Sequence, residues 1–461
     1  MNPSDAKRGL AVPRGRVSRL WHLGRAAGGI LAGAVGEGAE AWVRGRRPPL
    51  SELVLTPANA ERLAKRLAHL RGAALKLGQM LSLDGQDLLT PEFSRVLGRL
   101  RNQARTMPLS QLAAVLESEL GRDWNQSFSR FAFTPIAAAS IGQVHAATLK
   151  DGRRVAVKVQ YPGIREGIDS DVDNLTRLVR LAGLIPPGMD IKPLVEEARL
   201  QLHREADYRL EAESLVAYRT GLEGACESAD PALWVPDLVS GLCTQRVLTL
   251  EFADGLPVEE LAEGPRPQAL RDRVAAALSG LVLRELFELR LMQTDPNFAN
   301  YLYDAGRDRL VLLDFGAVRP IAPALAAAYR EMALAAIAGD GPRVRLSALD
   351  LGYLEGGTDP ALAQALVDLI LVVAEPLRAP GLYDFSATDL FERVRALGED
   401  LVLRGGYVVR PPPETLFLHR KIVGMFLLCR RLGARIHMPT LLAGLDCPSA
   451  SPLTIPATSE A

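Results

Sequence analysis

Three side chains late in the sequence have the types and spacing of a metal site that holds phosphate. Asp295 and Asn300 stand five residues apart in QTDPNFAN, and Asp314 follows a hydrophobic run in LLDFG. A carboxylate and a carboxamide on one loop, with a second carboxylate after the next strand, can hold Mg²⁺ against phosphate groups. Asn300 and Asp314 are therefore the predicted metal ligands. Asp295 is the predicted base or water-orienting group.

A lysine upstream would neutralise the phosphates. Lys158 ends the β-branched run VAVK, where a buried side chain would require an anionic partner. An exposed lysine on an edge strand would look the same, so this run alone is weak evidence. The helical segment HREADYRLEAES offers the candidate partners Glu205, Asp207, Glu211 and Glu213.

The segment AAASIGQV, residues 137–144, is in the register of the protein-kinase loop G-x-G-x-x-G-x-V. Its motif positions are Ala137, Ala139, Gly142 and Val144, so alanine replaces two of three glycines. A hairpin then leads to Lys158, and the Asp-Asn spacing and Asp-Phe-Gly follow in kinase order. These four elements predict a nucleotide-binding, kinase-like fold.

In that fold, residues 137–142, which include Ala138 and Ser140, would cover the phosphates. Adenine would hydrogen-bond main-chain groups near Glu251 and Phe252, where LTLEF leaves the small lobe.

The surrounding pattern predicts an α+β chain with two lobes. Segment 51–125 has helical periodicity, and Asp-Gly at 151–152 joins two strand-like runs as a hairpin. Strands are also expected at 246–252, 301–304 and 309–315, and helices to the end after Arg319. The predicted division is a basic, Gly/Ala-rich arm (1–50), a helical extension (51–125), an N-lobe (126–250) and a helix-rich C-lobe (251–461).

The chain resembles the UbiB (ADCK/AarF) family of atypical kinase-like ATPases, in the branch linked to ubiquinone biosynthesis. The resemblance covers nearly the whole chain and is carried by ALKLGQML, AAAS, EADYRLEA and QTDPNFAN. It implies that Glu211 pairs with Lys158, and that Glu205 and Asp207 form an E-x-D pair directed into the nucleotide cleft.

The resemblance also gives a role to the helix that carries Lys76 and Gln79, two residues that otherwise read as part of a solvated helix face. In the family, this K-x-G-Q helix folds across the site where a protein kinase receives its peptide. Lys76 and Gln79 would then face the carboxylates and the phosphates. Arg420 resembles the family's late arginine near the same element, although a surface arginine would look alike.

Composition limits the classes of partner. The chain has 54 basic and 54 acidic residues among 461, which argues against a nucleic-acid partner. Residues 1–48 carry nine Lys/Arg against three acids. Such an arm can be a solvated tail, a membrane-surface contact or a targeting segment. The four cysteines show no ligand spacing, and no run is long enough to span a membrane.

The expected function is therefore a Mg-ATP-dependent, kinase-like ATPase that supports coenzyme Q or other isoprenoid-lipid metabolism at a membrane surface. Gln-Thr-Asp in place of His-Arg-Asp, and no Ala-Pro-Glu after Asp314, argue against a protein substrate. The rival function is a lipid-binding scaffold for which nucleotide is only a conformational ligand, and a true protein kinase is the weakest alternative.

Expected partners are ATP, a lipid or quinone-precursor phenol, an anionic membrane, quinone-biosynthesis proteins and a second copy of the chain. The expected location is the cytoplasmic side of a bacterial inner membrane, with the mitochondrial matrix as the alternative.

Overall fold

The computed structural model describes residues 106–181, 191–224, 231–295, 297–405 and 413–443, together with two short strands. These strands, β1 (Ser82–Leu83) and β2 (Gln86–Asp87), pair antiparallel. The expectation of continuous helix over 51–125 is wrong here, because a two-residue strand pair is too short to give a visible alternation. The basic arm, Lys76 and Gln79 lie outside the described residues.

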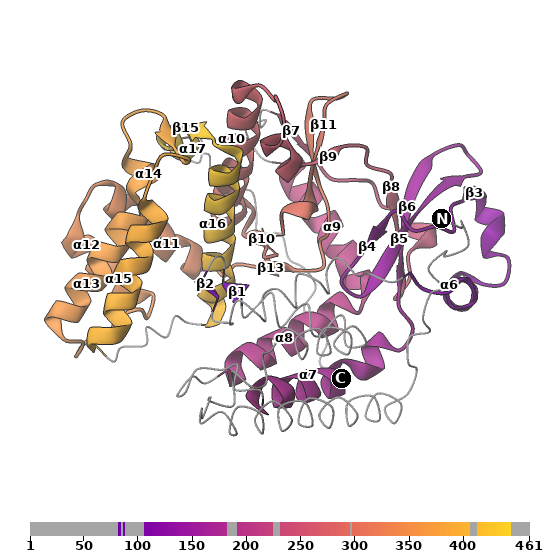
Figure 1. Cartoon of the computed structure of the whole chain (residues 1–461), viewed down its shortest axis with the longest axis horizontal. Coiled ribbons are helices and arrows are strands. Elements are labelled where there is room, and N and C mark those ends of the chain that lie inside the picture. Colours follow the sequence, from indigo (N-terminus) through magenta and orange to yellow (C-terminus); the bar gives the residue numbers. More distant parts are fainter. Residues whose placement is uncertain are drawn as a thin grey trace, which may run out of the picture. The chain divides into compact units, whose positions relative to one another are not determined.

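The chain divides into two compact units. Figure 1 labels their helices and strands and colours them along the sequence. Unit 1 consists of the chain up to Ala212 together with the segment Asp237–Phe252. Unit 2 consists of Glu213–Pro236 and the chain from Ala253 onward. The chain passes from unit 1 into unit 2 within helix α9 (Tyr208–Glu223).

Unit 1 is built on an antiparallel sheet in the order β3-β5-β6-β8, with β4 paired to β5. The predicted hairpin is present, and its turn contains Gly152 at φ +89°, a conformation that glycine adopts without steric cost. The strands are β3 (Phe128–Phe131), β4 (Ala137–Ala138), β5 (Gly142–Leu149), β6 (Arg154–Gln160) and β8 (Val247–Glu251).

One face of this sheet packs against helix α6 (Leu109–Leu120). Leu112 and Leu116 are fully buried in a cluster with Val157, Val159 and Val247 of the sheet. A single turn of 3-10 helix (Trp124–Ser127) joins α6 to β3. The packed valines fix the strands that carry the site.

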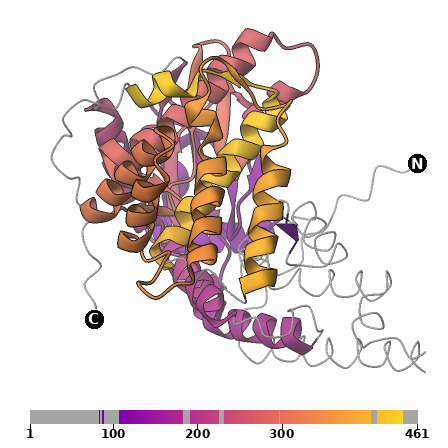
Figure 2. The ribbon, with the colours of Figure 1, turned by 90° about the vertical axis from the view of Figure 1, so that its left-hand side faces the viewer.

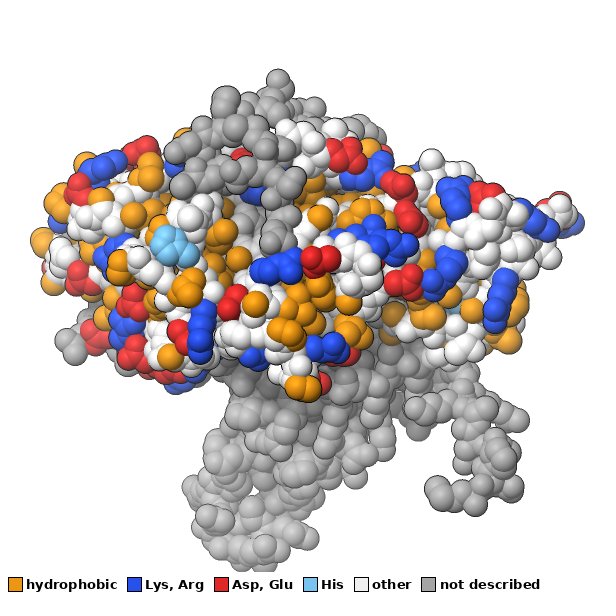
Figure 3. Space-filling model, turned by 90° about the horizontal axis from the view of Figure 1, so that it is seen from above, with side chains coloured by type: hydrophobic (Ala, Val, Ile, Leu, Met, Phe, Trp, Pro, Cys, Tyr) orange, Lys and Arg blue, Asp and Glu red, His pale blue; other side chains and the backbone are white. Residues whose placement is uncertain are grey.

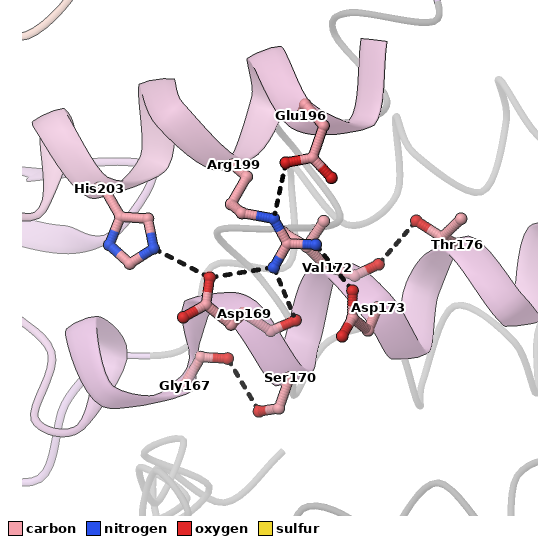
Figure 4. A network of polar contacts seen from close by, with 9 residues as sticks. All are labelled: Gly167, Asp169, Ser170, Val172, Asp173, Thr176, Glu196, Arg199 and His203. Atoms are coloured by element: carbon pink, nitrogen blue, oxygen red, sulfur yellow. Dashed lines mark hydrogen bonds and ion pairs between the residues drawn. The ribbon is translucent and has the colours of Figure 1, made fainter. Parts of the chain in front are cut away.

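Two further helices of unit 1, α7 (Ile164–Leu181) and α8 (Lys192–Glu205), are held together by Arg199. Its guanidinium lies 3.0 Å from Asp169 Oδ1 and 2.7 Å from Asp173 Oδ1, and Nε lies 3.4 Å from Glu196 (Figure 4). His203 Nε2 contacts Asp169 at 3.0 Å from one turn further along α8. This network fixes the end of α8, which is Glu205.

The described part of unit 2 contains three small sheets, in the orders β7-β12-β11-β9, β10-β13 and β14-β15. Of the predicted strands at 301–304 and 309–315, the first is confirmed and the second ends earlier, at Leu312; the two pair antiparallel, Tyr301 opposite Leu312. The strands are β7 (Ala232–Trp234), β9 (Leu256–Pro257), β10 (Leu291–Gln293), β11 (Tyr301–Asp304), β12 (Arg309–Leu312) and β13 (Val318–Pro320).

Helices make up the rest of unit 2. Helix α10 packs against α16, while α11, α12, α13 and α15 form a group of neighbouring helices (Figures 1 and 2). Their bounds are α10 (Gln268–Arg284), α11 (Pro323–Ile337), α12 (Gly341–Asp350), α13 (Pro360–Val373), α14 (Glu375–Arg378), α15 (Leu390–Gly405), α16 (Pro413–Leu432) and α17 (Met438–Ala443).

The expectation of helix alone after Arg319 is wrong at two places. Strand β13, which pairs with β10, extends one residue past Arg319 to Pro320, and β14 (Tyr383–Asp384) pairs with β15 (Arg435–Ile436). Each pairing joins two segments that are distant in the sequence, and each strand has only two or three residues. Such short strands leave no local periodicity that would predict them.

Candidate active site

Lys158 and Glu211 form the ion pair at the centre of the candidate site in unit 1. Lys158 Nζ donates to Glu211 Oε1 at 2.8 Å and to Oε2 at 2.9 Å. The side chains are 16% and 3% exposed, and the ammonium also lies 5.0 Å from the Tyr208 ring centroid. Strand β6 supplies the lysine and the first turn of α9 the glutamate, so the predicted pairing is confirmed.

The segment predicted to cover phosphates lies beside this pair. Ala137 is opposite Val144 in the sheet, and Val144 is opposite Lys158, so the three residues stand side by side on neighbouring strands. The Ala139 N–H donates to the Gly142 carbonyl at 2.9 Å, which closes the segment into a tight turn. Ala137 and Ala138 are exposed and Ala139 is half-buried, so the first two are open to a ligand that the segment would cover.

Gly142 is required at the base of this turn by close packing. An added Cβ would lie 2.5 Å from the Val159 carbonyl oxygen and 2.8 Å from the Tyr208 hydroxyl. A main-chain atom cannot move away without breaking the β5–β6 pairing. The one glycine that remains from the kinase motif is thus fixed by the fold.

The E-x-D pair divides into two different environments. Ser140 Oγ donates to Glu205 Oε2 at 3.2 Å, which links the alanine-rich segment to the end of α8. Asp207 instead accepts the Arg209 N–H at the start of α9 and contacts Gln245 Nε2 at 2.9 Å. Glu205 is next to the candidate phosphate segment, whereas Asp207 caps a helix.

The main-chain N–H groups of Glu251 and Phe252 already have partners. They donate to the carbonyls of Asp237 at 2.8 Å and Arg154 at 3.0 Å. The Arg154 guanidinium also covers the Phe252 ring at 4.1 Å. These two amides are not available as donors to an adenine ring, because the sheet edge uses them.

In unit 2, the predicted metal ligands are neighbours. The Leu313 N–H donates to the Asn300 carbonyl at 2.8 Å, which places Asn300 next to the segment that carries Asp314. Asp314 has φ +60°, an uncommon conformation for a residue with a side chain, and its Oδ1 accepts the Gly316 N–H at 3.2 Å. Asp295 is partly buried, and its Oδ1 accepts the Asn297 N–H at 3.2 Å.

The chemistry of these side chains fits Mg²⁺. Asn300 is 6% exposed, and within the described chain its Nδ2 has no hydrogen-bond partner. A half-turn of the amide places its oxygen at that position, where it is an acceptor for a cation. Mg²⁺ takes only one or two protein carboxylates or amides and fills its shell with phosphate oxygens and water. No cluster of three or more His, Cys, Asp or Glu side chains suited to a metal occurs among the described residues.

Comparison with known proteins establishes the family. The sequence profile of the ABC1 atypical kinase-like domain matches residues 99–347. The chain belongs to the ABC1 atypical kinase-like family. It is 42% identical to the atypical kinase COQ8B, mitochondrial, of Rattus norvegicus, over 94% of this chain and 81% of the rat protein. It is 36% identical to the atypical kinase COQ8, mitochondrial, of Saccharomyces cerevisiae, over 95% of this chain and 86% of the yeast protein.

A solved structure supports the fold assignment. The Rv3197 protein of Mycobacterium tuberculosis, solved as its erythromycin complex, superposes with a TM-score of 0.58 and 26% sequence identity. The match covers 84% of this chain and 95% of that one. The kinase-like α+β fold class and the family resemblance predicted from the sequence are confirmed.

Sequence reasoning missed Lys421 and selected its neighbour Arg420. Arg420 is half-buried, and burial together with this nearby guanidinium lowers the pKa of Arg319. Lys421 is 1% exposed and donates to the main-chain oxygen of Gln293 at 2.8 Å. Burial alone would lower the pKa of Lys421, but the facing Glu285 carboxylate raises it overall and keeps the ammonium charged. The apolar residues around Lys421 in FLHRKIVGMF were the one sequence feature that could have indicated its burial.

One face of the molecule has mixed charge. In the face drawn in Figure 3, acidic and basic side chains are interspersed among apolar and neutral ones. Within the described residues, we find no helix with the length and apolarity of a membrane span.

Proposed function

We propose that this protein binds Mg-ATP and hydrolyses it as a kinase-like ATPase that supports coenzyme Q biosynthesis. The observation that carries the proposal is the Lys158–Glu211 ion pair, in register with the alanine-rich segment. In protein kinases, the equivalent pair and a metal-bound Asp of the Asp-Phe-Gly motif must both be in place for phosphoryl transfer. The names of the rat and yeast relatives, COQ8B and COQ8, support the link to coenzyme Q.

Each residue then has a role. Lys158 neutralises phosphate oxygens while Glu211 fixes the position of its ammonium group. Residues 137–142 cover the phosphates, with Ser140 held by Glu205. Asn300 and Asp314 would hold Mg²⁺, which supplies charge stabilisation to the transferring phosphoryl group. Asp295 orients the attacking water or a small hydroxyl group.

The segment after Asp-Phe-Gly supports a small-molecule or water acceptor over a peptide. Strand β13 begins at Val318, two residues after Gly316, and α11 begins at Pro323. The chain thus re-enters regular structure at once. A protein kinase places its peptide-binding activation segment between Asp-Phe-Gly and Ala-Pro-Glu, and this sequence has no such stretch there.

The proposal extends to the family's added elements and to location. In this proposal, Lys76 and Gln79 of the helical extension would face Glu205, Asp207 and the phosphates, and Arg420 would lie near the same extension. The basic arm holds the protein against an anionic membrane. A bacterial inner membrane is one such surface and the mitochondrial matrix face is the other, the latter favoured by the names of the relatives. A quinone-precursor phenol, quinone-biosynthesis proteins and a second copy of the chain are the proposed partners.

The direct test is Asp314→Asn. Mg-dependent ATP hydrolysis should be lost, and binding of Mg-nucleotide should weaken, because the neutral amide binds Mg²⁺ less well than a carboxylate. The exposed Asp368 of α13 provides the control Asp368→Asn, which should behave as wild type. Full turnover in Asp314→Asn would overturn the metal assignment.

The scaffold alternative is tested with the same preparation. ATP hydrolysis is measured with and without vesicles that contain anionic lipid, and with a quinone-precursor phenol added. Turnover that rises with vesicles or with the phenol supports the ATPase. Nucleotide binding without turnover under every condition would favour the scaffold.

A further inference from the structure

A buried polar cluster in unit 2 surrounds the start of the catalytic loop. We call it the Glu285 cluster, and its members come from α9, the π-helical turn after α10, β10, β11 and α16. They are Tyr218, Glu285, Gln293, Tyr301 and Lys421. Each is at most 4% exposed. Gln293 is the first residue of Gln-Thr-Asp and lies two positions before Asp295.

Lys421 is the donor at the centre of the cluster. Its Nζ lies 2.8 Å from the Gln293 main-chain oxygen, 3.0 Å from Gln293 Oε1 and 2.7 Å from the Tyr301 hydroxyl. It lies 3.3 Å from Glu285 Oε2. Three donations and an ion pair use the ammonium fully, so its position is fixed by α16 and by its partners together.

Glu285 is the second charged residue that binds Gln293. Its Oε1 accepts the Gln293 N–H at 3.0 Å and the Tyr218 hydroxyl at 2.7 Å. Gln293 is therefore bound at its N–H, at its carbonyl and at its side chain by two oppositely charged residues. A buried ion pair adds little stability over an apolar pair, so the effect of these contacts is on the position of Gln293.

The orientation of the Gln293 amide links the cluster to Asp314. A lysine ammonium can only donate, so the amide oxygen must face Lys421 and the amide nitrogen must face the opposite way. That nitrogen lies 3.3 Å from the main-chain oxygen of Asp314. Asp314 has φ +60°, a conformation that persists only where its surroundings hold it.

We propose that Lys421 is a positioning residue for the metal site, acting through the Gln293 amide on the backbone of Asp314. The inference rests on the proposed Mg-nucleotide function. The Phe315 ring, which follows Asp314, packs against Tyr218 with a centroid distance of 5.1 Å, so a second contact of the cluster holds the same segment.

The experiment separates positioning from stability. Lys421→Met alone leaves the Glu285 carboxylate buried without its cation and should unfold readily. The double variant Lys421→Met/Glu285→Gln removes both charges and should recover a melting temperature near that of wild type. Its Mg²⁺ concentration for half-maximal ATP hydrolysis should nevertheless rise about tenfold, as when partners that orient a metal ligand are removed. Binding of ATP in EDTA should be unchanged.

The matched control is Tyr353→Phe. Tyr353 belongs to a separate buried polar group at α16, with His419 and Tyr329. The substitution should shift the melting temperature without changing the Mg²⁺ requirement. A wild-type Mg²⁺ requirement in the folded double variant would overturn the inference.

If the double variant does not fold, Gln293→Glu carries the test. It keeps an acceptor for Lys421 and replaces the donor to the Asp314 carbonyl with a carboxylate oxygen, which cannot donate when ionised. A wild-type Mg²⁺ requirement there would overturn the inference. Absence of Mg-dependent turnover in the wild-type protein would instead overturn the proposed function, and this inference with it.

Discussion

Lys158 and Glu211, 53 positions apart in the sequence, meet with the lysine nitrogen within 2.9 Å of both carboxylate oxygens. Glu211 is almost fully buried, so the contact joins a sheet strand to the first turn of α9 where solvent screens it little. Nucleotide binding and stability of unit 1 should both depend on this pair.

Lys158→Met should lower the free energy of unfolding by about 3 kcal/mol, because the buried carboxylate loses its cation. Lys158→Met/Glu211→Gln should regain most of that stability but not the affinity for ATP. Urea unfolding and calorimetric ATP titration measure the two effects. ATP affinity that returns with stability would show that Lys158 has a structural role only.

Gly142→Ala should destabilise unit 1 by about 1–3 kcal/mol or more, since an overpacked site must shift its neighbours. The Cβ would meet the Val159 carbonyl oxygen, a main-chain atom that cannot yield. Gly241→Ala is the control, because an added Cβ there has no atom within 4 Å. Equal melting temperatures for the two variants would contradict the packing argument.

Ala139→Gly should change the affinity ratio of ATP to ADP or permit autophosphorylation, because loss of the Cβ lets the segment approach phosphates more closely. Fluorescence titration with each nucleotide and a phosphate-incorporation assay detect the change. Ala114→Gly in α6 is the control, which should cost helix stability without altering nucleotide preference. An unchanged ratio and no autophosphorylation in Ala139→Gly would make this alanine incidental.

Acid should destabilise the protein through His419. Burial lowers the pKa of His419 from 6.5 to about 4, while Nε2 lies 2.7 Å from the Tyr353 hydroxyl. The unfolded chain therefore binds a proton first, so this contribution is complete above pH 6.5 and is lost as pH falls towards 4. The loss should reach about 3 kcal/mol at most. In His419→Gln, the slope of unfolding free energy against pH should flatten over that window, and an unchanged slope would contradict the assignment.

Local sequence patterns predicted much of unit 1. Asp151 and Gly152 between two β-branched runs specify a hairpin whose register follows from the turn, and that register alone sets Val144 beside Lys158. Local patterns did not identify the ion-pair partner of Lys158. Four acids in one segment were candidates, and only the family resemblance selected Glu211.

In unit 2, the motif order predicted Asp295, Asn300 and Asp314 because their chemistry requires fixed residue types. It did not predict Lys421, since the apolar residues around it in FLHRKIVGMF were the one local sign of burial and do not indicate its partners. It also did not predict that Asp207 caps α9, or that the amides of Glu251 and Phe252 are already bonded.

The amino-acid sequence by itself determined the chemistry of this protein and its short-range elements, because residue types at fixed spacing and local turn residues act within a few positions along the chain. The tertiary structure alone decided that Lys421 meets Glu285 and Gln293. Lys421 reaches Gln293 across 128 positions, and no periodicity carries information over that distance. Burial of a charge is tolerable only where distant segments supply its partner, so such pairs are specified by packing.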